Sequence, residues 1–164
     1  MASTITPATL TVKISESVIL NGSEQGNTNT ITVSNINEIS REIFHCDTSE
    51  NNLLWFIDEI ASADTGSGHN RFLRNKVMYV RITNLDDTNY VTLTIRNHSD
   101  DEFAIKLSAG ASFIVNGASS TAVNNIFDAS GNAISPASTL GDLYSINGLA
   151  NTANCDLEMF VASI

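Results

Sequence analysis

Apolar and polar residues alternate with a period of two in many short segments of the chain. In the clearest of these, Leu10, Val12 and Ile14 are separated by polar residues, and the pattern recurs from Val91 to Ile95. Because successive side chains of a strand point to opposite faces of a sheet, this alternation predicts β-strands with one buried face. Other segments fit a strand as well: Ile31–Val33, Ile39–Cys46, Leu53–Ile60, Val77–Asn84, Glu102–Leu107, Ser112–Val115, Leu143–Ile146 and Leu157–Val161.

The connections between these segments are turns rather than helices. Stretches such as NGSEQGN, DTGSGHN and SAGAS are rich in Gly, Asn, Asp and Ser, which favour turns. An α/β fold would need crossovers of about a dozen residues, usually helical, between parallel strands. We therefore predict an all-β protein, a single antiparallel β-sandwich of jelly-roll type with about ten short strands, in which residues 1–164 form one domain. The segment ENNLLWFIDEIA has partly helical spacing, but it is apolar on all sides around Trp55 and Phe56, which favours a buried strand.

One long segment, residues 117–141, has few apolar residues and is rich in Ala, Ser, Asn and Gly. Loops of this length in compact domains are usually functional or disordered. Sparse apolar residues in such a loop are suited to gain order against a partner, which predicts an interface; the alternative is a loop folded back over its own sandwich. The predicted interface residues are Asn124, Ile126, Phe127 and Ile134.

The segment Arg81–Ile95, RITNLDDTNYVTLTI, has two alternating runs around an acidic stretch. The more apolar face is even-numbered in the first run and odd-numbered in the second, so a hairpin that pairs Ile82 with Val91 needs a loop with an even number of residues. A four-residue loop, Leu85–Thr88, allows an ordinary type I turn. We predict a hairpin with a structural acidic corner.

The alternative for this corner is a calcium site. Asp86 and Asp87 are adjacent and lack the spacing of a calcium-binding loop, so Asp100 and Asp101 would have to supply further ligands. We favour no metal and no cofactor. The sequence also shows no nucleophile elbow, no phosphate-binding loop and no H-x-H pair, so we expect no catalytic residues and no enzyme activity. The histidines stand apart from one another at His45, His69 and His98.

Charge and composition limit the partners. The net charge is −10, which opposes binding to nucleic-acid phosphates. No segment approaches the run of about 20 apolar residues that spans a bilayer, and the N-terminus lacks the pattern of a secretory signal, so we expect a protein made in a cytoplasm and no membrane partner. Cys46 and Cys155 lie in apolar runs, which favours buried, reduced thiols over a disulfide.

Three stretches resemble small virion structural proteins of tailed phages, particularly those of marine hosts. They are VMYVRITNLDDTNYVTLTI, EFAIKLSAGASFIV and ANTANCDLEMFVASI, within the last 90 or so residues. The resemblance is carried by a central strand at Tyr79–Asn84, a Leu-x-x-Gly turn at Leu107–Gly110 and the closing segment Val161–Ile164.

This resemblance implies a non-catalytic virion protein that is assembled in the host cytoplasm and contacts capsid or tail proteins. A capsid decoration or head-appendage protein is the first expectation, acting by self-association as a homo-oligomer, and a tail or fibre-associated protein is the alternative. A carbohydrate-binding β-sandwich is a further alternative. Sugar sites stack on exposed aromatic rings, whereas we expect Trp55 and Tyr79 to be buried.

Overall fold

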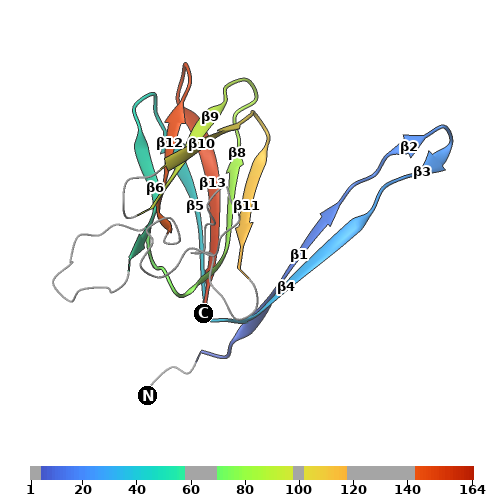
Figure 1. Ribbon diagram of the computed structural model, residues 1–164, viewed down its shortest axis with the longest axis horizontal. Helices are drawn as coiled ribbons and strands as arrows, with labels where there is room; N and C mark the ends of the chain where they lie inside the picture. Colours follow the sequence, from blue (N-terminus) through green and yellow to red (C-terminus); the bar gives the residue numbers. More distant parts are fainter. Residues whose placement is uncertain (1–4, 58–69, 98–101, 118–142) are drawn as a thin grey trace.

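The structure is a computed structural model that describes residues 5–57, 70–97, 102–117 and 143–164. Within these residues the chain forms 13 β-strands and no helix, which confirms the all-β prediction. Most of the strands lie in two sheets that face one another, and a long two-stranded ribbon extends from the base of one sheet (Figure 1). Pairing is antiparallel except between two strands at one edge.

The first sheet has five strands and the second has four. The order in the first is β10 (Glu102–Leu107), β9 (Val91–Asn97), β12 (Leu143–Ala150), β6 (Asn51–Ile57) and β7 (Arg71–Leu73). The order in the second is β11 (Ser112–Asn116), β8 (Val77–Asn84), β13 (Cys155–Ser163) and β5 (Glu38–Cys46). Residues 51–57 are therefore a strand, as favoured over a helix, and the remainder of that predicted segment lies outside the described residues.

One hydrophobic core fills the space between the two sheets. It combines Leu53 and Phe56 of the five-stranded sheet with Val80 and Leu157 of the four-stranded sheet, all fully buried. The inward residues predicted for Arg81–Ile95, namely Ile82, Val91, Leu93 and Ile95, are buried as well. Period-two alternation thus identified which side chains enter the core.

The predicted hairpin from Arg81 to Ile95 is wrong. β8 pairs with β11 and β13, whereas β9 pairs with β10 and β12 in the other sheet. Ile82 accordingly lies opposite Phe113 and Met159, not opposite Val91. The connection after Asn84 therefore crosses from one sheet to the other.

Two cysteines and one glycine lie at buried positions of the core. Cys46 and Cys155 are both buried and unbridged, and they lie directly opposite each other on β5 and β13. At Gly148 on β12, an added Cβ would lie 2.9 Å from the Leu53 side chain and 3.1 Å from the Cys46 sulfur. Glycine at this position therefore allows β12 to approach the core closely, and a larger residue would displace the Leu53 side chain.

Candidate assembly surface

The N-terminal ribbon, here called the arm, comprises β1 (Ala8–Ser15), β2 (Ile19–Leu20), β3 (Ser23–Glu24) and β4 (Thr28–Ile36). β1 pairs with β4 and β2 pairs with β3, so the arm is one long hairpin. Its tip is a two-residue turn, Asn21-Gly22, with φ of 53° and 80°. Two successive positive φ angles are typical of the tight hairpin turn that Asn-Gly favours.

One side of the arm is apolar and the other is polar. The cross-strand pairs Leu10/Val33 and Val12/Ile31 lie on the apolar side. The alternate pairs, Thr11/Thr32, Lys13/Thr30 and Ser15/Thr28, lie on the opposite side. Because paired residues share a face, the ribbon is amphipathic along β1 and β4.

The base of the arm packs on the outer face of the four-stranded sheet. There Val33 and Ile36 are buried in a second hydrophobic cluster with Met78, Tyr79 and Ala162. A register shift next to Ala8, with Asn35 at a φ of 64°, bends the ribbon near this contact. The polypeptide then passes through Asn37 directly into β5.

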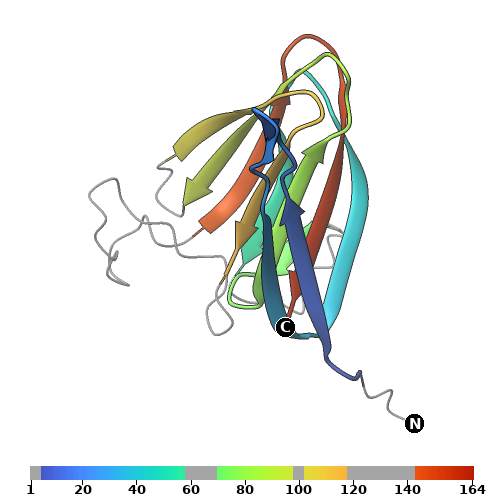
Figure 2. The same ribbon diagram turned by 90° about the vertical axis from the view of Figure 1, so that its right-hand side faces the viewer.

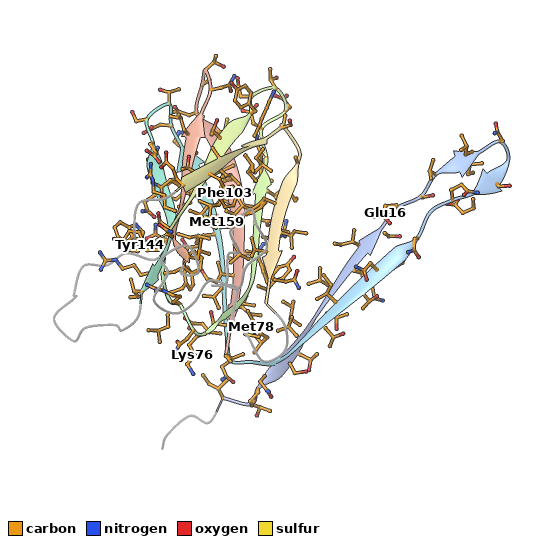
Figure 3. The ribbon with its side chains drawn as sticks, viewed as in Figure 1. Glu16, Lys76, Met78, Phe103, Tyr144 and Met159 are labelled. Atoms are coloured by element: carbon orange, nitrogen blue, oxygen red, sulfur yellow. The ribbon has the colours of Figure 1, made fainter. Side chains whose placement is uncertain are left out.

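The distal arm has no such support within the described residues. It diverges from the two sheets in Figure 1, and in the view turned by 90° it lies in front of them (Figure 2). Glu16 lies on the part of the arm that is already well away from the sheets (Figure 3). The exposed fraction rises from 1% at Val33 to 36% at Ile14 and 73% at Ile19. Val18 and Leu20 are exposed too. An isolated two-stranded ribbon is marginally stable in water, so exposed apolar residues on such a ribbon indicate a contact surface.

The acidic corner is built as a structural turn. The Asp86 carboxylate accepts hydrogen bonds from the backbone N–H groups of Thr88 (2.8 Å) and Asn89 (2.5 Å). These bonds, first that from Asn89, lower the pKa of Asp86. The buried Asn84 side chain donates to the carbonyls of Asn89 and Leu107 and fixes the start of the corner. The acidic stretch is therefore a structural corner, as predicted, although this corner connects two sheets rather than two strands of one hairpin.

No metal centre is found in the part of the chain that the structure describes, where no group of three or more His, Cys, Asp or Glu residues is placed to hold an ion. His45 hydrogen-bonds to Asp156 (2.9 Å) and Asn154 (3.0 Å) beside the acidic corner. Asp100 and Asp101, the candidate calcium ligands, lie outside the described residues, as do His69 and His98.

Charged residues occupy the middle of the outer face of the four-stranded sheet. Glu158 on β13 accepts hydrogen bonds from Arg41 on β5 (Nε, 2.7 Å) and Arg81 on β8 (2.6 Å). These bonds, first that from Arg41, lower the pKa of Glu158. Two guanidinium groups share one carboxylate, so the trio carries a charge of about +1 in an acidic protein.

The aromatic residues that bear on sugar binding are arranged unfavourably for it. Tyr79 is buried as expected, but Trp55 is half-buried. Its ring meets Tyr144 edge to face at 5.1 Å with an interplanar angle of 69°, and Arg71 lies over the Trp55 ring. Two inclined rings do not provide one flat stacking platform.

The predicted interface residues Asn124, Ile126, Phe127 and Ile134 lie outside the described residues, so that prediction stays open. The arm was missed: its strands were expected to have a half-buried face. The signal for it was the Asn21-Gly22 pair between two alternating runs. The described residues include no helix that is long and apolar enough to span a membrane. Comparison with known proteins finds neither a matching family model nor a matching curated protein.

Proposed function

We propose that this chain is a non-catalytic structural protein of a virion, which acts by associating with copies of itself and with the particle. The observation that carries this proposal is the arm, whose distal apolar residues Ile14, Val18, Ile19 and Leu20 are exposed. Soluble proteins seldom leave neighbouring large apolar side chains on a projecting element unless another surface covers them. The arm is therefore suited to bind a protein surface.

The strand order supports the finer fold assignment, a jelly roll. One sheet has the order β5-β13-β8-β11 and the other contains β6-β12-β9-β10, with β7 added at the edge. In such a fold most successive strands lie in opposite sheets, and the first and last strands of the sandwich are neighbours, as β5 and β13 are here. Jelly rolls are common in viral capsid proteins, but a fold alone does not identify a function.

Within the virion, a capsid decoration or head-appendage protein is our first choice. A tail or fibre-associated structural protein is the alternative, since both classes need surface contacts and no catalytic centre. The net charge of −10 favours protein partners over the packaged nucleic acid. We accordingly place the protein on the particle, after its synthesis in the host cytoplasm.

Co-sedimentation tests this function. Purified chain is mixed with assembled particles of the virus that encodes it and centrifuged, with chain alone as the control. Saturable recovery in the particle pellet supports the proposal. A chain that remains in the supernatant and is also monomeric contradicts it. Saturable binding on a glycan array, without particle binding, would favour the carbohydrate-binding alternative.

A further inference from the structure

The base of the arm shows which kind of surface its apolar side fits. There the ribbon lies on the outer face of a β-sheet of its own chain, against Tyr79 and Ala162. The distal half continues the same hairpin, with Ile14 on the same side as Val12, but it has left that sheet (Figure 1). The outer face of a second, similar sheet would cover the apolar side of the distal half, just as the sheet of the same chain covers the apolar side of the base.

Each copy of the chain carries such a surface on β5. This strand is an edge of the four-stranded sheet, and its outward residues include Ile39 and Ile43, exposed by 56% and 69%. They lie in the same sheet face as the arm base, since Ile39 is the cross-strand neighbour of Ala162. The apolar surface that covers the arm base thus continues to the exposed residues of β5.

The charges of the two surfaces are complementary. From Ile14 to Thr30 the arm contains Glu16 and Glu24 and no lysine or arginine. Between Ile39 and Ile43 on β5 lies Arg41, part of the trio with a charge of about +1. The acidic arm tip would therefore meet the exposed guanidinium group of Arg41 when it lies across Ile39 and Ile43.

The surface area that a docked arm would bury indicates whether one arm or two arms form the contact. A two-stranded ribbon is about 10 Å wide, and the eight residue steps from Ile14 to Gly22 span about 26 Å. One docked arm would thus remove about 500 Å² of surface from water, counting both partners, which is below the roughly 1,000 Å² expected of a specific interface. Two arms exchanged reciprocally reach that value, which favours a two-fold dimer over a one-way contact.

We propose that the partner of the distal arm is a second copy of this chain, and that each arm docks its apolar side across Ile39 and Ile43 of the other copy. This inference rests on the proposed function, self-association, and specifies its contact. It also explains why a ribbon that is marginal alone has so regular an amphipathic pattern.

A mixed-chain cross-link tests the contact. One chain carries Leu20→Cys and the other Ile43→Cys, so a disulfide that joins them forms only between copies. The native cysteines are buried and remain in both chains. As a matched control, Leu20→Cys is mixed with Phe103→Cys, since Phe103 is 47% exposed but lies on β10 of the other sheet (Figure 3). We expect oxidation to link the first pair and not the control pair.

A second measurement does not depend on cross-linking. Leu20→Ser should weaken self-association by about tenfold or more in sedimentation equilibrium, because an apolar side chain leaves the contact. Phe103→Ser should leave self-association unchanged. Equal linking of both cysteine pairs, or a Leu20→Ser chain that associates like the unmodified one, overturns the proposed contact.

The outcomes also separate this contact from the proposed function. If the unmodified chain co-sediments with particles but is monomeric at all concentrations tested, the reciprocal dimer is wrong while a structural role on the virion stands. If the unmodified chain neither self-associates nor co-sediments, the proposed function itself fails.

Discussion

A matched pair of leucine substitutions separates residues that hold the fold from residues that serve assembly. Leu93 is fully buried in the core between the sheets, whereas Leu20 at the arm tip is 62% exposed. Leu93→Ala removes buried methyl groups and leaves a cavity, so it should lower the free energy of unfolding by about 2–5 kcal/mol. For a chain of this length that corresponds to a melting temperature lower by about 4–20 °C.

Leu20→Ala should change the unfolding free energy of the monomer by less than about 0.5 kcal/mol, because its side chain is mostly in water already. It should instead weaken self-association. Urea unfolding is measured at a low and a high protein concentration, because association stabilises the folded state by mass action. If both variants lose the same free energy of unfolding at the low concentration, the assignment of Leu93 to the fold and of Leu20 to assembly is refuted.

Three further predictions concern single positions. Gly148→Ala should destabilise the fold by about 1–3 kcal/mol in urea unfolding, since the added methyl overpacks the core; a variant as stable as the unmodified chain would show that β12 does not approach so closely. The hydrogen bonds that lower the pKa of Glu158 contribute stability above its ordinary pKa of 4.5, and this contribution is lost as pH falls through the lower folded-state pKa. Glu158→Gln should therefore be less stable at pH 7 and lose less stability in acid, and an acid slope equal to that of the unmodified chain would contradict this. Burial raises the pKa of Cys46 to about 11 and also raises that of Cys155, so both thiols should react with a labelling reagent only after unfolding; absence of free thiol before reduction would argue for a disulfide instead.

Local sequence patterns predicted most strands and their inward residues. Val77–Asn84 and Glu102–Leu107 have the predicted bounds, because alternation reports which side chains avoid water. Alternation does not report which strand is the neighbour. The run from Val91 satisfied every parity requirement for pairing with Ile82, yet the two strands belong to different sheets. The alternation of apolar residues limits the registers in which two strands can pair, but it does not determine which strands pair. Here β8 and β9 instead pair with β13 and β12, which are distant in sequence.

The arm illustrates the same limit for function. The pattern of Leu10, Val12 and Ile14 predicts one apolar face, but it does not tell whether the protein itself covers that face. In the structure the rest of the protein shields the apolar side of the arm as far as Val12, which is half-buried. Ile14, the next residue on that side, is exposed. The predicted interface at Asn124, Ile126, Phe127 and Ile134 rested on the sparse apolar residues of a long loop, whereas the arm presents its apolar residues on a defined ribbon.

Backbone hydrogen exchange of the arm as a function of protein concentration tests the central claim most directly. A two-stranded ribbon alone opens readily, so amides from Ile14 to Leu20 should exchange fast in dilute protein and become protected as copies associate. Amides of β8 in the core should be protected at every concentration. If the arm amides exchange at the same rate over a concentration range in which the chain associates, the arm is not the element through which this protein assembles.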